Sequence, residues 1–388
     1  MDERSKYEQR GVSATKDEVH AAIKHLDKGL YPLAFCKILP DLVGGDENFC
    51  NIMHADTAGT KTSLAYLHWK ETGDKSIWRG VSQDAIVMNV DDMACVGCTD
   101  QIVLSSTIGR NKNLMPGEVI QELINGTTSF IESMQNQGVN IVLAGGETAD
   151  VGDIVRTIDV GFTTFARLPK EKLIINDIQA GDVIVGLASY GQTTYETYYN
   201  SGIGSNGLTA ARHDVLHKKY AQRYPDSYDP NTDDSVVFTG PHDLRDASGI
   251  RDLSIGDALL SPTRTYLPVL KAIFDAHHPN IHGVIHCTGG GQTKVSKFVQ
   301  DKHIIKDDLF PTPPLFQLIQ EASGTHWKEM FQVFNMGHRI ELYVNRQMAE
   351  DIISLAESFS LDAKIVGRVE DHQGSKVTIS HEGNVYTY

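Results

Sequence analysis

Acidic side chains recur in the first half of the chain beside short apolar runs and small residues. Mg²⁺ prefers one or two protein carboxylates together with phosphate oxygens and water. A carboxylate beside apolar positions is costly unless it is paired or bound to a metal. We therefore predict that carboxylates from three segments gather around one or two Mg²⁺ ions: Asp56, Asp84, Asp91, Asp92 and Glu147. Any one of them alone would fit a helix cap or a surface charge equally well.

A lysine and several glycines accompany the carboxylates, as a phosphate site requires. Lys61 follows the small-residue turn 57–60, and further glycine-rich turns occur at 145–147 and 288–291. Lysine ammonium groups and the backbone N–H groups of such turns bind phosphate oxygens. We expect the turns and the carboxylates to meet, so that Mg²⁺ and phosphate are held together.

The elements that must position these residues alternate between strands and helices. Asp84 and Asp91 lie seven positions apart in a predicted buried helix, which places both side chains on one face. Pro116 and Gly138 mark the two ends of the longest amphipathic pattern. In this half the predicted helices are 63–73, 82–97 and 115–138, and the predicted strands are 47–56, 99–109, 139–148 and 154–168.

A polar, turn-rich stretch around Pro169 separates this half from a second alternating series. We place a domain boundary there, with domains 1–169 and 170–388, and predict a mixed α/β (α+β) fold in both. In the second half the predicted helices are 205–220, two within 255–277, 293–299 and 346–360. The predicted strands are 182–189, 281–287, 330–344, 363–370 and 375–380, and 221–245 is predicted to be a solvated insertion loop.

Composition limits the kind of protein further. The chain has 388 residues, a length typical of two domains, and a formal net charge of −15. A basic face is normal in a nucleic-acid-binding protein, so we expect no nucleic-acid partner. The charged N-terminus and the lack of a long apolar run predict no secretory signal and no membrane span. Five cysteines are few for this length, so we expect a reducing, cytoplasmic location.

Seven short motifs occur in an order that resembles one enzyme family. They read HADTAGTK, NVDDM, GGETAD, SNG, LLSPTRTY, HCTGGG and FNMG. Each motif is weak alone, but the ordered set is similar to that of aminoimidazole ribonucleotide synthetase, also called phosphoribosylformylglycinamidine cyclo-ligase. The resemblance extends over nearly the whole sequence, and LLSPTRTY at 259–266 weighs most in choosing this family.

The resemblance implies a reaction of purine biosynthesis. ATP would activate the amide oxygen of formylglycinamidine ribonucleotide, a phosphoribosylated amidine, and ring closure would give aminoimidazole ribonucleotide, ADP and phosphate. In phosphoryl transfer the protein mainly positions the reactants and neutralises charge. Carboxylates that hold Mg²⁺, a lysine and glycine turns can do both. The resemblance also implies a homodimer. An N-terminal ATP-binding domain would form it through its sheet, beside a C-terminal synthetase domain.

The matching positions carry the family's functional residues onto this sequence. The predicted catalytic residues are Lys61, Asp92 and His286. The predicted nucleotide-binding residues are Asp56, Gly59, Thr60, Lys61, Asp84, Gly145, Gly146 and Glu147. The predicted substrate-binding residues are Ser205, Asn206, Gly207, Arg264, Thr288, Gly289, Gly290, Gly291 and Asn335. For Arg264 and Asn335 a local structural role is the competing interpretation.

The sequence also departs from the family pattern, which keeps two other interpretations open. The first motif has Thr57 and Ala58 where the family has glycine and valine, and a histidine usual before SNG is missing. Cys36 and Lys37 match a reactive pair of selenophosphate synthetase, a member of the same superfamily. A different class would be a nucleotide-binding paralogue without catalytic activity, acting as a scaffold or sensor.

Overall fold

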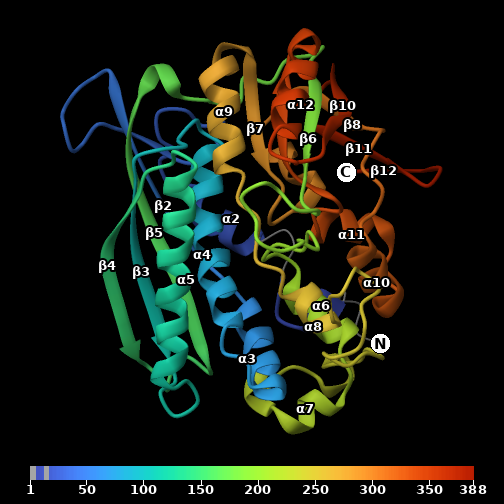
Figure 1. The fold of residues 1–388 in the computed structure, drawn as a ribbon. Helices are drawn as coiled ribbons and strands as arrows, with labels where there is room; N and C mark the ends of the chain where they lie inside the picture. The colour runs from blue at the N-terminus through green and yellow to red at the C-terminus, as the bar shows by residue number, and fades with distance from the viewer. Residues whose placement is uncertain (1–5, 13–16) are drawn as a thin grey trace.

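The computed structural model describes residues 6–12 and 17–388 and contains two β-sheets, one in each half of the chain (Figure 1). The first sheet has five strands in the order β1-β2-β5-β3-β4. These are β1 (Ile38–Pro40), β2 (Phe49–Thr57), β3 (Ile102–Arg110), β4 (Ile141–Asp150) and β5 (Ile158–Pro169). β3 and β4 run parallel, and the other neighbours are antiparallel. The predicted strands of this half are confirmed.

Three helices cover one face of the first sheet, and its other face carries no layer in Figure 1. They are α3 (Lys61–Thr72), α4 (Ile77–Ala94) and α5 (Gly117–Asn136). Alternate residues explain this arrangement, because Ile52 and Leu104 are fully buried toward the helices while Met53 and Val103 point outward and are exposed. α5 has an apolar stripe and a polar outer face, as a surface helix should.

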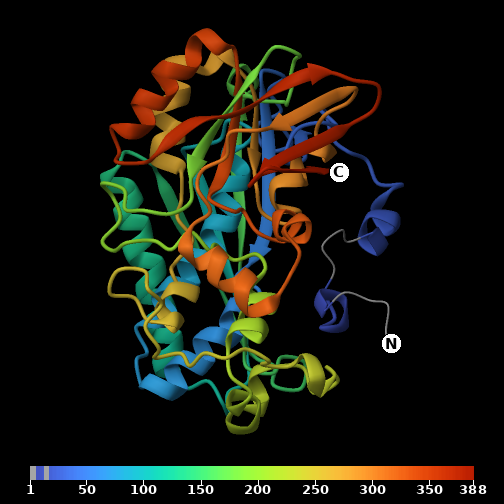
Figure 2. The same cartoon turned by 90° about the vertical axis from the view of Figure 1, so that its right-hand side faces the viewer.

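The second sheet has seven strands in the order β12-β11-β8-β10-β6-β9-β7. They are β6 (Val183–Ala188), β7 (Ile281–His286), β8 (Lys302–Lys306), β9 (His338–Val344), β10 (Ala363–Asp371), β11 (Lys376–His381) and β12 (Asn384–Thr387). The helices of this half are α6 (Leu208–Val215), α7 (Lys219–Arg223), α8 (Ile255–Leu259), α9 (Leu267–His277), α10 (Pro314–Ser323), α11 (Trp327–Val333) and α12 (Ala349–Glu357). Figure 2 views this half from the front, with two short helices, α1 (Lys6–Gln9) and α2 (Asp17–Ile23), at one side.

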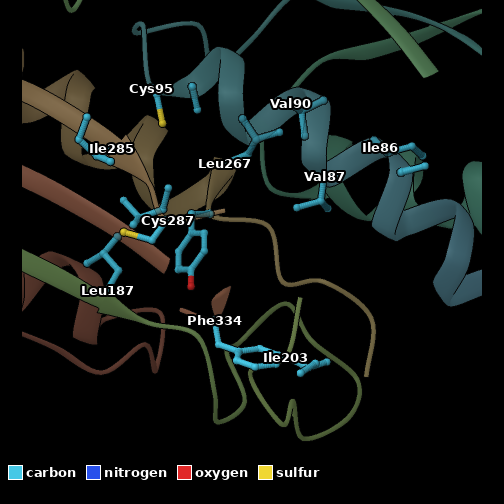
Figure 3. Close-up of a cluster of buried hydrophobic side chains, with 14 of the residues drawn as sticks. Ile86, Val87, Val90, Cys95, Leu187, Ile203, Leu267, Ile285, Cys287 and Phe334 are labelled. Carbon is cyan, nitrogen blue, oxygen red and sulfur yellow. The ribbon is translucent and has the colours of Figure 1, made fainter. Parts of the chain in front are cut away.

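Helix α4 joins the two halves through a shared apolar core. Val87 and Val90 of α4 lie in one cluster with Leu267 of α9 and Ile285 of β7 (Figure 3). Because α4 packs against the first sheet on one side and against α9 on the other, it is buried around most of its surface. A helix buried on all sides is normally apolar all round. α4 departs from this, because Asp84, Asp91 and Asp92 are buried in it and therefore need partners inside the protein.

Four predictions about the second half are wrong. The segment 330–344 is not one strand, because α11 ends at Val333 and β9 begins only at His338. Its apolar run is ambiguous between helix and strand when read by period alone. The predicted helix 205–220 is broken into α6 and α7, and 293–299 is a 3-10 turn. The loop 221–245 is not fully solvated, since Val237 and Phe238 are completely buried.

Candidate active site

The end of α4 meets strand β7 in a buried carboxylate–histidine pair. Nδ1 of His286 lies 2.7 Å from Oδ1 of Asp92, and Arg339 of β9 donates from Nε to Nε2 of His286 at 3.1 Å. Arginine can only donate, so Nε2 is the acceptor and the ring proton sits on Nδ1. Burial lowers the pKa of His286 to about 4 despite the opposing effect of Asp92. His286 is therefore a neutral imidazole at pH 7.

His54 of β2 adds the first sheet to the same pair. Its Nε2 lies 3.3 Å from Oδ2 of Asp92, and its Nδ1 lies 3.2 Å from the side-chain oxygen of Asn89. Burial opposes ionisation of Asp92, but hydrogen bonds from His286 and His54 hold the pKa of this carboxyl well below its usual range. For His54 the effect of burial is outweighed by Asp92, which raises the pKa of the imidazole. One carboxylate thus links elements from both halves of the chain.

Lys61 and Asp84 form a second buried pair, two turns earlier along α4. The Lys61 ammonium lies 2.7 Å from Oδ1 of Asp84 and also donates to the carbonyl of Ser261 at 2.6 Å. Burial lowers the pKa of Lys61 and raises the pKa of Asp84, while their mutual attraction opposes both shifts. Lys61 is fully buried, so the ammonium is directed at the protein interior and not at an open surface.

Asp91 has its hydrogen bonds inside the protein. Its Oδ1 accepts from the hydroxyl of Thr265 at 2.6 Å, and the backbone N–H of Tyr266 lies 3.1 Å from Oδ2. Burial raises the pKa of Asp91 to about 7 despite these bonds and the charge of Arg339. Thr263 donates to Asp84 in the same way, from its backbone N–H at 2.7 Å. The segment 261–266 therefore caps both α4 carboxylates.

Two predicted loops approach the turn that follows β2. The hydroxyl of Thr60 lies 2.8 Å from that of Thr209, which follows the SNG motif, and Gly59 has the positive φ of 59° that favours glycine. Ser205 lies 3.1 Å, hydroxyl to hydroxyl, from Thr263. Gly207, with a φ of 77°, caps the start of α6. The structure thus brings the first motif, SNG and LLSPTRTY together.

The glycine turn 288–291 lies next to this assembly. A Cβ placed on Gly289 would meet only the side-chain nitrogen of Asn206, at 3.9 Å. The backbone N–H groups of Gly289 and Gly290 have no hydrogen-bond acceptor in the part of the chain that the structure describes. The Lys294 ammonium lies 2.6 Å from the hydroxyl of Thr288. These donors are arranged as an anion site requires.

Arg264 and Asn335 are placed differently from their prediction as substrate contacts. Arg264 is buried, makes a two-pronged bond to Glu196 and donates to the carbonyl of Tyr190 at 2.7 Å. Asn335 accepts from Ser189 at 2.8 Å and donates to a backbone carbonyl at 2.8 Å. Both side chains use their polar atoms on the protein, which matches the competing interpretation of a local structural role.

Glu147, Gly145 and Gly146 lie away from the other predicted residues. Glu147 pairs with Thr107 on the exposed outer face of the first sheet, whereas Asp56 is in register with the buried Phe162 on the helix-covered face. The strand order separates β2 from β4 by three strand spacings, roughly 14 Å. Directly opposite residues share a face of a sheet. The expectation that Asp56, Asp92 and Glu147 share one cleft within a protomer is therefore wrong.

The five predicted metal ligands do not form one cluster. Among residues 6–12 and 17–388, the single group of three metal-capable side chains with ligand atoms within 4.8 Å of one another is Cys287, His338 and Glu341. Asp84 keeps one buried oxygen, Oδ2, that has no hydrogen-bond partner in the described chain, and Asp56 is exposed. These oxygens suit Mg²⁺ by chemistry, and the metal assignment stays a prediction.

Sequence reasoning missed several residues of this site. His54 stands in the first motif, where the sequence pattern indicates only a strand position, and no periodicity marks Arg339 or Glu196. Lys294 lies three residues after the glycine turn 288–291, close enough in the sequence to contribute to a phosphate site. Its positive charge is the one sequence feature that indicates such a role. The others acquire their roles only through contacts between distant segments.

Comparison with known proteins agrees with the motif order. The family model "AIR synthase related protein, N-terminal domain" matches residues 40–168, and its C-terminal counterpart matches 179–380. A phosphoribosylformylglycinamidine cyclo-ligase from Methanocaldococcus jannaschii is 31% identical over 325 residues, 82% of this chain and 78% of the relative. One from Methanococcus vannielii is 30% identical over 295 residues, covering 74% and 71%.

Solved structures show the same fold at low sequence identity. The HypE-HypF complex matches with a TM-score of 0.54 at 14% identity, over 97% of this chain and 99% of that one. T. maritima PurL complexed with ADP matches with a TM-score of 0.51 at 13% identity, over 97% of this chain. The chain spans about half the length of PurL, at 47%. Fold and site thus define a two-domain α/β protein of the AIR synthase type.

The particular family follows from the sequence matches. The chain belongs to the AIR synthase-related family, and its curated relatives at about 30% identity are named phosphoribosylformylglycinamidine cyclo-ligase. No helix in the described part of the chain combines the length and the apolar character needed to cross a membrane.

Proposed function

We propose that this protein is an ATP-dependent cyclo-ligase that converts formylglycinamidine ribonucleotide to aminoimidazole ribonucleotide, with release of ADP and phosphate. The observation that carries the proposal is the 31% identity to a cyclo-ligase over 82% of this chain. The buried junction of Asp92, His286 and Arg339 beside a glycine turn supports it. The reaction belongs to purine biosynthesis, and we expect it to take place in the cytoplasm.

The reaction requires a site that binds phosphate and a substrate whose amide is held in place. The amidine nitrogen must also lie close to the amide carbon, so that the ring can close. Phosphoryl transfer from ATP to the amide oxygen makes that oxygen a leaving group, and the neighbouring amidine nitrogen then attacks the carbon. Mg²⁺, when bound with ATP, would neutralise phosphate charge. In our proposal the N–H groups of Gly289 and Gly290, with Lys294, bind a phosphate, and Ser205 and Asn206 contact the substrate. Neutral His286, oriented by Asp92, is suited to accept a proton at Nε2 once Arg339 moves.

We further propose that the protein acts as a homodimer through the outer face of the first sheet. Met53, Phe165, Val103 and Val142 are in register across four strands and form one apolar row on that face. Met53 is 61% exposed and Val142 is 58% exposed, and an exposed apolar patch of this kind is typical of an interface. Glu147 lies on the same face, so in a dimer it would lie at the interface.

Selenophosphate-type chemistry is the first alternative, and the environment of Cys36 disfavours it. A reactive cysteine needs a lowered pKa and access to solvent. Cys36 is 4% exposed, and its thiol donates to the backbone carbonyl of Asp92 at 3.2 Å. Burial raises the pKa of this thiol well above its ordinary value, and the Asp92 charge adds to the effect. The thiol is therefore held protonated.

The test is turnover with the proposed substrate. Purified protein is incubated with ATP, Mg²⁺ and formylglycinamidine ribonucleotide, and ADP release is followed together with aminoimidazole ribonucleotide. Product formation that depends on all three components is the expected result. Nucleotide binding without turnover on this substrate or on selenide would contradict the proposal and favour the paralogue without catalytic activity.

A further inference from the structure

A buried ionic group lies directly beneath the glycine turn and has no role in the reaction proposed above. Lys306 of β8 and Glu341 of β9 are both 0% exposed and form an ion pair. His338 lies 2.9 Å from the same Glu341 oxygen, and Tyr343 donates to the other oxygen at 2.7 Å. Although burial opposes it, Lys306 and His338 hold the pKa of Glu341 at about 2. The carboxylate is thus charged and fully hydrogen-bonded.

The same group includes three side chains that could bind a metal ion, but the Lys306 ammonium provides the positive charge beside Glu341. Cys287, His338 and Glu341 have ligand atoms within 4.8 Å of one another. The Lys306 ammonium bonds to the same Glu341 oxygen that His338 contacts. Burial and the charge of Glu341 raise the pKa of the Cys287 thiol well above its ordinary value, which disfavours the thiolate that binds metal. The group is therefore a fixed ion pair and not a metal site.

Gln292 connects this ion pair to the glycine turn. Lys306 donates to the backbone carbonyl of Gln292 at 2.6 Å and to its side-chain oxygen at 3.0 Å. Gln292 is fully buried and directly follows Gly291. A Cβ on Gly291 would lie 2.5 Å from the carbonyl oxygen of Phe331, so the turn is already pressed against α11. The position of the turn is therefore set by the hydrogen bonds from Lys306 to Gln292 and by close contact with the α11 backbone.

Gln292 also connects the turn to the second substrate loop. Its side-chain nitrogen donates to the backbone carbonyl of Asn335 and, at 2.9 Å, to that of His338. The side-chain nitrogen of Asn335 in turn donates to the carbonyl of Gly202 at 2.8 Å, three residues before Ser205. Lys306, Gln292 and Asn335 thus form a continuous hydrogen-bonded chain from the turn 288–291 to the loop 202–207.

We infer that Lys306, Glu341, Gln292 and Asn335 are positioning residues that set the distance between the turn 288–291 and the loop 202–207. The inference rests on the proposed function only in taking these two segments as the substrate-binding loops. A buried ion pair is often no more stabilising than apolar residues of similar volume, so stability alone does not account for it. In our inference, the buried ion pair instead fixes the turn 288–291 and the loop 202–207 relative to each other.

The experiment uses Gln292→Met in the full-length protein. This change removes the side-chain bonds of Gln292 to Asn335, His338 and Lys306, but it leaves Lys306 bonded to Glu341 and to the backbone carbonyl of residue 292. We expect the KM for formylglycinamidine ribonucleotide to rise at least about tenfold, since small misplacements of binding groups are costly. The KM for ATP and kcat should each stay within about threefold. Gln320→Met is the matched control, because Gln320 of α10 also donates from its side chain to a backbone carbonyl, that of Thr325 at 3.1 Å.

Hydrogen–deuterium exchange supplies a readout that does not depend on activity. In Gln292→Met the amides of 202–207 and 288–297 should exchange at least about tenfold faster, while those of α4 stay at the wild-type rate. Uniform acceleration, or unchanged exchange with an unchanged substrate KM, would overturn the inference. If Gln292→Met does not fold, Lys306→Arg, which keeps the charge but alters the geometry, is measured in the same two assays.

The two proposals fail in different ways. A wild-type protein that does not turn over formylglycinamidine ribonucleotide would remove the proposed function but would leave the exchange measurement intact. Normal wild-type turnover with no effect of Gln292→Met on substrate KM or on loop exchange would remove only the positioning role.

Discussion

The imidazole of His286 lies 2.7 Å from the carboxylate of Asp92, and this contact joins strand β7 of the C-terminal half to helix α4 of the N-terminal half. His54 reaches the other oxygen of the same carboxylate at 3.3 Å. Asp92 and His286 are 194 positions apart in the sequence, and this one carboxylate orients imidazoles from both halves of the chain. A substitution of Asp92 should therefore change the positions of the His286 and His54 imidazoles relative to each other.

Asp92→Asn should reduce turnover by at least about 100-fold, because the amide cannot supply the charge that orients His286 and His54. The loss of unfolding free energy should stay near 1–3 kcal/mol, since an asparagine oxygen still accepts one hydrogen bond. Steady-state ADP release and urea denaturation measure the two effects. Asp308→Asn, which breaks an exposed 2.7 Å pair with Lys364, is the control. Near-normal rates in Asp92→Asn would exclude Asp92 from the reaction.

Lys61→Met should destabilise the protein by about 3–5 kcal/mol, because it leaves the buried Asp84 carboxylate without a counter-charge. The double variant Lys61→Met/Asp84→Leu should recover most of this loss, since both charges are then absent. Turnover should remain undetectable in the double variant if Lys61 takes part in catalysis. A double variant that is both stable and active would show that the pair is structural only. Denaturant titration and ADP release are measured on the same preparations.

Met53→Glu and Val142→Lys should convert the proposed dimer to a monomer. Each places a charge in the apolar row of the outer sheet face, where it would be desolvated in an interface. Sedimentation velocity over a range of concentrations gives the association state. Val385→Glu alters an equally exposed residue of β12, 65% exposed, and should leave the association state unchanged. A wild-type protein that sediments as a monomer at all concentrations would contradict the dimer directly.

Cys36→Ser should leave turnover within about threefold of wild type. The serine hydroxyl can still donate to the carbonyl of Asp92, and a buried thiol with a raised pKa supplies little thiolate. The assay is ADP release with formylglycinamidine ribonucleotide, accompanied by iodoacetamide labelling of the native protein. Abolished activity, or rapid labelling of Cys36, would instead favour the selenophosphate-type interpretation.

Glu341 should make the stability of the protein depend on pH under acidic conditions. Its pKa is about 2 in the folded protein and about 4.3 when unfolded. The unfolded chain therefore binds more protons between these values, and the contribution of Glu341 is lost as the pH falls from about 4.3 to about 2. The contribution at neutral pH is on the order of 3 kcal/mol at most.

Glu341→Gln tests this by removing the titrating group. The variant should be less stable than wild type at pH 7, and the difference should shrink as the pH falls through the same window. Urea denaturation at a series of pH values measures it. A difference that stays constant from pH 7 to pH 2 would show that folding does not lower the pKa of Glu341.

Much of the fold was accessible from local patterns. Alternating residues predicted β5, and proline and glycine at the ends of α5 predicted its limits. The spacing of Asp84 and Asp91 correctly placed both on one buried helix. These predictions succeed because strand and helix periods depend on residues within a few positions of one another. The segment 330–344 failed for the same reason, since a short apolar run has no distinguishing period.

The sequence by itself determined the order of the motifs, the two α/β halves and the identity of the charged residues that the interior would have to accommodate. Only the tertiary structure decided their partners: Lys61 pairs with Asp84, Arg264 with Glu196, and Glu147 lies on the face of the sheet opposite Asp56. The physical reason is that strand register and helix packing bring together residues far apart in the chain. A carboxylate buried in that way takes whichever donor the fold supplies.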